Sequence, residues 1–162
     1  MARETASLIR EFQRADLAAL KALVHKTIAT CYPSRYCVEA VRFFIDYHDA
    51  EAILRDAKEG RTIVLDKASR ILGTGTIVGG EIKRVFVDPT FQRQGFGRRI
   101  VERLEEAAAL QGVKTVKLDA SLPSKVFYER LGYTTIGPAS LPVENGRRLD
   151  FFKMQKNLCE GV

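Results

Sequence analysis

The pattern of apolar and polar positions in the first third of the chain predicts a short strand followed by helices. Residues 7–12 suit a strand, and over residues 14–28 apolar side chains recur at three- and four-residue intervals, the spacing of one helix face. Pro33 ends this helix, because the residue before a proline disfavours helical geometry. Further helices are predicted over residues 38–47 and 50–57.

The pattern then changes to strands. Residues 61–66 are rich in β-branched side chains, and strands are also predicted over residues 71–78 and 81–87, with Gly79-Gly80 as the turn between the last two. These three strands are expected to form an antiparallel meander. An amphipathic helix, a strand, a short helix and two closing strands follow, over residues 96–111, 115–119, 125–131, 133–136 and 148–154.

Together these elements predict an α/β fold: a mixed, mostly antiparallel sheet of six or seven strands with helices on both faces. The helical crossover makes strand 115–119 parallel to strand 81–87. No repeat, linker or charge block divides the 162 residues, so we expect one domain over residues 1–162.

Composition fits a soluble protein: 46% of residues are hydrophobic, 28% are charged, and no apolar run is long enough to span a bilayer. The N-terminus lacks the apolar segment of a signal peptide, so we expect a cytoplasmic protein with no membrane partner. Cys31, Cys37 and Cys159 form no CxxC pair and are expected to be reduced thiols, and no metal site is predicted. The net charge of +6 suits an anionic partner, whether nucleic acid, a phosphate-bearing cofactor or an acidic surface.

The most informative segment joins the strand ending at Val87 to the helix that begins near Phe96, through a loop that contains Gly95 and Gly97. The first amides of a helix have no intrahelical partner and can bind phosphate oxygens. Arg98 and Arg99 oppose the helix dipole unless an anion binds there, although Arg98 could instead pair with Glu102. The loop lacks the Lys-Ser/Thr of a Walker motif and the third glycine of a dinucleotide fingerprint.

Two motifs resemble the GNAT acetyltransferases. Residues 92–97, QRQGFG, resemble the Q/R-x-x-G-x-G/A motif of that family, and residues 127–133, FYERLGY, resemble its FYEKLGF signature. The interval between them fits a helix and a strand. The resemblance implies an N-acetyltransferase that uses acetyl-CoA, with the CoA pyrophosphate on the loop amides, pantetheine on the preceding strand, and a gap between the parallel strands. The implied cofactor contacts are Phe86, Val87, Gln92, Arg93, Gln94, Gly95, Phe96, Gly97, Arg98, Ser121 and Ser124. Ser121 stands where many relatives have asparagine.

Two residues are candidates for acid and base. Tyr128 of the second motif is the candidate acid for the leaving thiolate, as the family resemblance suggests; a merely packed tyrosine is the alternative. Glu81 is the candidate base for the amine, because it lies eleven residues before Gln92, and this spacing resembles that of the catalytic glutamate in histone-acetylating relatives. A solvated carboxylate is the alternative. The amide of Val87 could polarise the thioester carbonyl.

The acceptor is expected to be a primary amine on a small molecule, reached by direct transfer in a ternary complex. Alternatives are a protein N-acetyltransferase acting on lysine or an N-terminus, and a non-catalytic CoA-sensing or nucleic-acid-binding module; we expect no nucleic-acid partner. Tyr32, Arg35 and Tyr36, in the loop between the first two helices, are candidate acceptor contacts, and His48 is a lesser candidate catalyst. A homodimer is compatible with the sequence.

Overall fold

One seven-stranded sheet forms the frame of the protein in a computed structural model that describes residues 6–158. The strand order is β1-β2-β3-β4-β5-β7-β6. β4 and β5 are parallel and the other neighbouring pairs are antiparallel, as predicted. The strands are β1 (Leu8–Glu11), β2 (Arg61–Lys67), β3 (Arg70–Val78), β4 (Glu81–Val87), β5 (Thr115–Ser121), β6 (Thr134–Pro142) and β7 (Arg148–Asn157).

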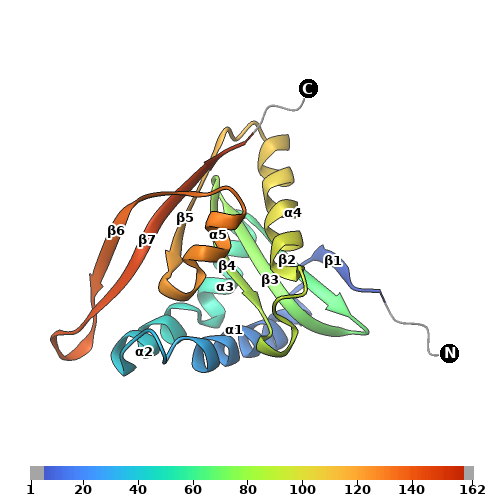
Figure 1. The fold of residues 1–162 in the computed structure, drawn as a ribbon. Helices are drawn as coiled ribbons and strands as arrows, with labels where there is room; N and C mark the ends of the chain where they lie inside the picture. Colours follow the sequence, from blue (N-terminus) through green and yellow to red (C-terminus); the bar gives the residue numbers. More distant parts are fainter. Residues whose placement is uncertain (1–5, 159–162) are drawn as a thin grey trace.

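Helices cover both faces of this sheet, which confirms the predicted architecture (Figure 1). Apolar residues of α1 and α3 share one core cluster with β2 and β4, and those of α4 share another with β2 to β5. The helices are α1 (Leu17–Cys31), α2 (Val38–Tyr47), α3 (Ala50–Glu59), α4 (Phe96–Leu110) and α5 (Lys125–Arg130).

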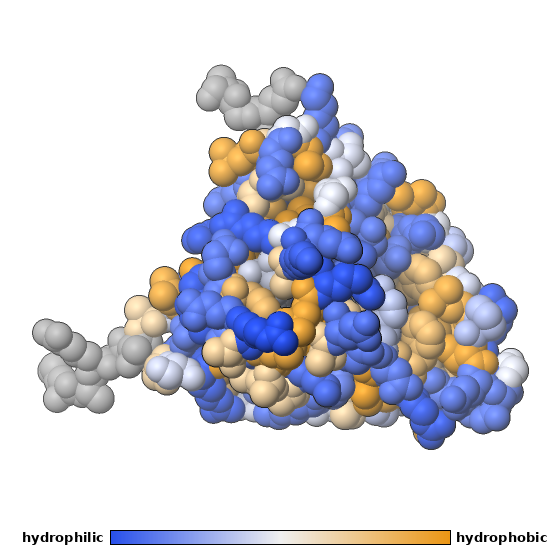
Figure 2. Space-filling view, turned by 180° about the vertical axis from the view of Figure 1, so that it is seen from behind, coloured by the Kyte–Doolittle hydropathy of each residue, from blue (hydrophilic) through white to orange (hydrophobic). Residues whose placement is uncertain are grey.

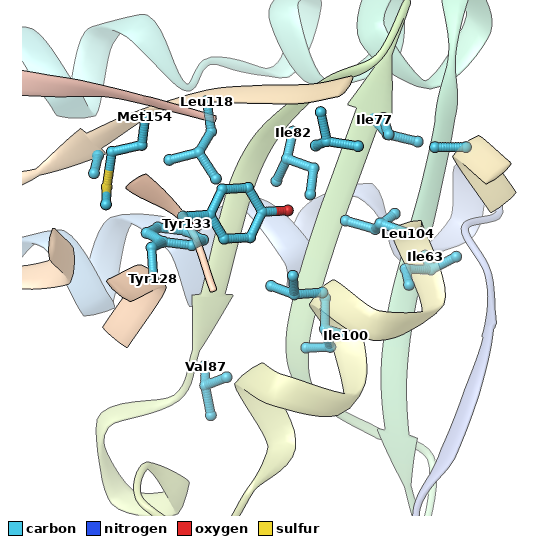
Figure 3. Packing of buried hydrophobic residues seen from close by; sticks show 14 of the residues in the cluster. Ile63, Ile77, Ile82, Val87, Ile100, Leu104, Leu118, Tyr128, Tyr133 and Met154 are labelled. Atoms are coloured by element: carbon cyan, nitrogen blue, oxygen red, sulfur yellow. The ribbon is translucent and has the colours of Figure 1, made fainter. Parts of the chain in front are cut away.

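Two glycines of β3 allow α4 to lie close against the sheet. A Cβ on Gly75 would come within 2.5 Å of the Ile100 side chain, and one on Gly73 within 2.8 Å of it. Ile100 and Leu104 are fully buried, and Figure 3 shows both beside the strand residues of this cluster. Close packing explains why glycine interrupts an otherwise β-branched strand.

The C-terminal hairpin is longer than the sequence pattern predicts. β6 continues through Pro138 to Pro142, where the prediction has a loop after residue 136. Among the strands of residues 6–158, β6 pairs only with β7 and lies at the edge of the sheet, so a proline without an N–H can be accommodated there. The predicted turn is present, with φ of 57° at Asn145 and 68° at Gly146.

Hydrophilic side chains predominate on the face seen from behind, with hydrophobic atoms visible between them (Figure 2). None of the helices within residues 6–158 is long and apolar enough to cross a membrane. Cys31 and Cys37 are free thiols, and Cys159 lies outside the described residues.

Candidate functional site

The N-terminus of α4 presents backbone amides that no part of the helix uses. Gly95 precedes the helix with φ of +85°, a left-handed conformation that favours glycine. The first helical hydrogen bond runs from the Arg99 amide to the Gly95 carbonyl, at 3.1 Å. The amides of residues 96–98 therefore lack intrahelical acceptors, and no side chain within residues 6–158 caps them. With no acidic residue in the first turn, this end of α4 suits an anion.

The second glycine of the loop has a different role, which joins the two sequence motifs. A Cβ on Gly97 would lie 3.0 Å from the ring of Phe127, so the absence of a side chain lets that ring pack against α4. The Phe127 and Tyr128 rings meet edge to face, with centroids 5.0 Å apart. The contact between Gly97 and Phe127 thus brings α5 and Tyr128 to the beginning of α4.

The turn between β4 and α4 is held by side chains. One Asp88 carboxylate oxygen accepts from the Thr90 amide at 2.9 Å, and the other from Lys26 Nζ of α1 at 3.1 Å. Burial alone would raise the pKa of Asp88, but these hydrogen bonds lower it below its usual value. Gln92 Nε2 donates to the Val87 carbonyl at 3.0 Å, so the first motif residue secures the end of β4.

The parallel strands β4 and β5 separate shortly after they meet. Their pairing covers Glu81 with Lys117 and Ile82 with Leu118, at the beginning of β4. The Asp88 amide donates to a β3 carbonyl at 2.8 Å, and because antiparallel strands alternate the direction of their amides, the Val87 amide points to the opposite edge, toward β5. The strands diverge there, as Figure 1 shows, leaving the predicted gap.

A cavity of about 210 Å³ lies in this gap. It brings together seven of the residues that the sequence singles out: Glu81 and Phe86 from β4, Ser121 at the end of β5 and Ser124 soon after it, Tyr128 from α5, and Tyr32 and His48, which follow α1 and α2. Residues 92–98 are not part of its wall and lie on the adjoining turn and helix, where Gln92, Arg93, Gln94 and Arg98 are exposed.

Tyr128 is buried, at 7% exposure, yet its hydroxyl makes no hydrogen bond with another residue of the range 6–158. Burial raises the pKa of this phenol well above its usual value, and the nearby Tyr32 raises it further. Burial likewise raises the pKa of Tyr32, to about 12. Tyr128 is therefore protonated throughout the neutral range and has a proton to donate into the cavity.

Glu81 has a carboxylate without a hydrogen-bonding or ionic partner among residues 6–158, although it is half-buried at the cavity wall. The other carboxylate of the wall, Asp119, has Lys153 at 3.7 Å. The Ser124 hydroxyl donates to the Ser121 carbonyl at 3.1 Å, so the Ser121 hydroxyl donates to Ser124 Oγ at 2.8 Å. A hydrogen bond from either serine to a ligand would require a hydroxyl to rotate.

One wall of the cavity escaped the sequence analysis. α2 contributes Phe43, Phe44 and Tyr47, and β4 contributes the buried Arg84. His48, which follows α2 and is named above as a lesser candidate catalyst, also lines the cavity and packs edge to face on Phe86, with ring centroids 5.4 Å apart. The only available signal was the row of aromatic residues before His48, which reads equally well as a buried helix face.

Of the three candidate acceptor contacts, one lines the cavity and two do not. Tyr32 lines the cavity, whereas Arg35 is exposed and is not part of the wall. The Tyr36 hydroxyl donates to the Asp150 carbonyl at 2.7 Å and accepts from the Leu122 amide at 2.8 Å, so it fastens the loop to β7 and to the end of β5. On α4, Arg99 donates to the hydroxyl of Ser7, the residue before β1, at 2.7 Å.

Comparisons with known proteins agree with this geometry. The chain is 30% identical over 87 residues to the IAA acetyltransferase of Azospirillum brasilense; the match covers 48% of this chain and 57% of that relative, little more than half its length. Among solved structures, a GCN5-related N-acetyltransferase from Rhodopseudomonas palustris superposes with a TM-score of 0.86 at 19% identity, covering 98% of this chain and 99% of the other. The PaiA N-acetyltransferase of Thermoplasma acidophilum, solved with coenzyme A, gives 0.75 at 16% identity, covering 94% and 99%.

A family model for the acetyltransferase (GNAT) domain matches residues 32–158, which include the turn, α4, the strand gap and Tyr128. The chain belongs to the GNAT acetyltransferase family.

Proposed function

We propose that this chain transfers an acetyl group from acetyl-CoA to the primary amine of a small molecule, by direct transfer within a ternary complex. The observation that carries the proposal is the convergence of three features: the unpaired amides of α4, the gap between β4 and β5, and a cavity in that gap lined by both Tyr128 and Glu81. The Thermoplasma relative, solved with coenzyme A, supports the choice of cofactor.

The residues present fit coenzyme A. The amides of residues 96–98 would donate to its diphosphate. Arg98, whose Nε lies as far as 4.0 Å from the Glu102 carboxylate, adds positive charge at the same helix end. The Val87 amide, facing the gap, would donate to the pantetheine arm or the thioester carbonyl. Bound in this way, the thioester supplies the acetyl group and a thiol leaving group.

Glu81 is proposed to take the proton from the amine. A lysine-like amine has a pKa near 10.4, so about 4.6 kcal/mol is needed to deprotonate it at pH 7. The Glu81 carboxylate lines the cavity and is not engaged by another described residue, so it is free to accept this proton directly or through water.

Tyr128 is proposed to donate a proton to the departing thiolate. Its raised pKa keeps the proton on the phenol until negative charge develops nearby. The same burial makes donation more uphill than for an exposed tyrosine, so Tyr128 assists only a leaving group that carries substantial charge. The hydroxyl has no competing partner among residues 6–158, which leaves it free to turn toward the sulfur.

A small acceptor is favoured by the shape of the site. The aromatic side chains of α2 close one side of the cavity, and Leu141 of β6 contributes on another. A lysine or N-terminus of a folded protein would have to pass between these elements, whereas a free small-molecule amine has only to fit the cavity of about 210 Å³.

Tyr128→Phe tests the acid. We expect turnover, followed as free thiol released from acetyl-CoA, to fall about 100-fold, a typical contribution of general acid catalysis, while affinity for CoA stays within about twofold. Tyr133→Phe is the matched control, because its hydroxyl bonds Glu105 at 3.2 Å and is not part of the cavity wall. Equal turnover in Tyr128→Phe and wild type would reject the acid role.

Glu81→Gln tests the base. We expect its rate to depend more steeply on pH below about 8 than that of wild type, because only the small neutral fraction of the amine reacts without a base. Asp119→Asn is the control, since that carboxylate lines the same cavity but faces Lys153. A steeper profile in Asp119→Asn and an unchanged one in Glu81→Gln would transfer the role to Asp119.

A further inference from the structure

A buried charged cluster borders the cavity and has no part in the transfer described above. The Arg84 side chain is 1% exposed, and its Nη2 donates to Asp56 of α3 at 3.0 Å. Its Nε donates to Nδ1 of His48, also at 3.0 Å. The cluster therefore joins the central strand β4 to α3 and to the residue that follows α2.

An irregularity in the pairing of β3 with β4 directs the Arg84 side chain toward Asp56 and His48. β3 and β4 pair Thr74 with Phe86 and Thr76 with Lys83, so Arg84 and Val85 both face Gly75 in a β-bulge. Arg84 has a φ of +56°, a left-handed conformation that is costly for a residue with a side chain. Strain of this kind is retained where the side chain must be re-aimed, and here it directs an arginine to the cavity side of the sheet.

The contact with Arg84 fixes the tautomer of His48. A guanidinium can only donate, so Nδ1 of His48 is the unprotonated nitrogen and Nε2 carries the hydrogen. Burial, followed by the charge of Arg84, lowers the pKa of His48 to about 3, so the ring is neutral at physiological pH. Nε2 has no partner within residues 6–158, and His48 lines the cavity.

Arg84 also has an unused donor. Its Nη1 has no hydrogen-bond partner and the atom itself is shielded from solvent, and among residues 6–158 it is the only side-chain nitrogen or oxygen of which both are true. Arg84 lines the same cavity as His48. A buried guanidinium hydrogen without an acceptor is unfavourable, and a ligand oxygen would remove the deficit. Two donors, from His48 and Arg84, thus lack acceptors beside one cavity.

We propose that Arg84 and His48 bind a carboxylate of the acceptor, so that the acceptor is an amino acid with an apolar side chain. This inference rests on the proposed acetyl transfer and names its substrate class. The charges of the cavity are complementary to a zwitterion: Glu81 is available to the ammonium group, and Lys83, also in the wall, adds positive charge near Arg84.

The remaining wall accounts for the apolar side chain. Phe43, Tyr47 and Phe86 surround the space next to His48. Aromatic rings accept aliphatic or aromatic groups by burial and edge-to-face packing. Asp56 balances the charge of Arg84 and keeps the guanidinium in place, so Asp56 is a positioning residue that does not meet the substrate.

The test compares L-phenylalanine with phenethylamine, which differ by the carboxylate. Dissociation constants are measured by calorimetry on the protein saturated with CoA, and CoA binding is measured first. We expect wild type to bind L-phenylalanine at least about tenfold more tightly than phenethylamine, as for a hydrogen-bonded charged group. His48→Phe, which keeps a ring beside Phe86, should reduce that ratio several-fold, and Arg84→Met should bring it close to one.

Two further variants separate binding from folding. Arg84→Met leaves Asp56 buried without a partner, so Arg84→Met with Asp56→Leu is measured as well and should show the same lost ratio. Arg42→Met is the control: it removes the same charge from an exposed arginine of α2 that pairs with Glu144, and should keep the wild-type ratio.

Three results would overturn the carboxylate site: a wild-type ratio near one while CoA binds normally, an unchanged ratio in the Arg84 variants, or tighter binding of O-phosphoethanolamine than of L-phenylalanine. Failure of CoA itself to bind would instead reject the proposed function on which the inference rests.

Discussion

Lowering the pH from 7 to 5 should destabilise this protein through one histidine. His48 is 7% exposed, its ring packs against Phe86, and its Nδ1 accepts from Arg84. Protonation would put a second positive charge beside that guanidinium and would remove its acceptor. The carbonyl of His48 accepts from Nε2 of His25, at 2.8 Å, so the ring cannot easily move away while the backbone is held.

The magnitude follows from the two pKa values. Burial first, and the charge of Arg84 second, lower the pKa of His48 from 6.5 to about 3. Between pH 6.5 and pH 3, His48 therefore binds a proton in the unfolded chain but not in the native state. Its contribution to the free energy of unfolding is complete above pH 6.5 and declines as the pH falls toward 3. Linkage between these values gives a loss of about 2 kcal/mol between pH 7 and pH 5.

Urea unfolding at pH 7 and pH 5 measures this loss, for wild type and for His48→Phe. The variant is expected to be less stable at pH 7, because Arg84 Nε loses its acceptor, but its stability should fall by about 2 kcal/mol less than that of wild type on acidification. The chain has two histidines, and His25 is present in both proteins, so the difference isolates His48. Equal losses in the two proteins would refute the buried, neutral histidine.

Two further substitutions test how the site is held together. In Gly97→Val the new Cβ meets Phe127 at 3.0 Å, so we expect a loss of about 1–3 kcal/mol in unfolding free energy and weaker CoA binding. Gly137→Val, which adds its Cβ in open space, should retain CoA affinity. Equal CoA affinity in both variants would contradict the contact between Gly97 and Phe127. Tyr36→Phe removes both hydrogen bonds of a buried hydroxyl and should lower the free energy of unfolding, measured in urea, by about 1–3 kcal/mol. Tyr47→Phe, at an exposed tyrosine, should lower it little. Equal losses in the two variants would show that the Tyr36 hydroxyl does not hold its loop in place.

The elements that local pattern determines could be predicted from the sequence. The loop before α4 is an example, because Gly95 is needed for its own left-handed backbone, a requirement that neighbouring elements do not alter. The spacing of the two motifs correctly indicated a helix and a parallel strand between them. The role of Gly97 could not be predicted, because it depends on the Phe127 ring, which is its nearest neighbour in the structure.

The features that depend on distant partners could not be predicted. Arg84 occupies a strand position at which the sequence predicts an exposed arginine. Its burial depends on the bulge opposite Gly75 and on its partners Asp56 and His48. The sequence predicts a loop at Pro138, because proline is unfavourable inside a sheet. Only the order of the strands shows that β6 is an edge strand, where proline can be accommodated. The aromatic wall of α2 has the same periodicity as an ordinary core helix.

The central claim is that backbone amides at the start of α4 hold a diphosphate while the end of β4 pairs with the attached arm. A ¹⁵N-edited NMR titration with coenzyme A tests it most directly. We predict saturable shifts that are largest for the amides of Phe96, Gly97, Arg98 and Val87, and smaller shifts throughout β6 and β7. Saturable binding that leaves those four amides unmoved, or no binding at all, would contradict the account.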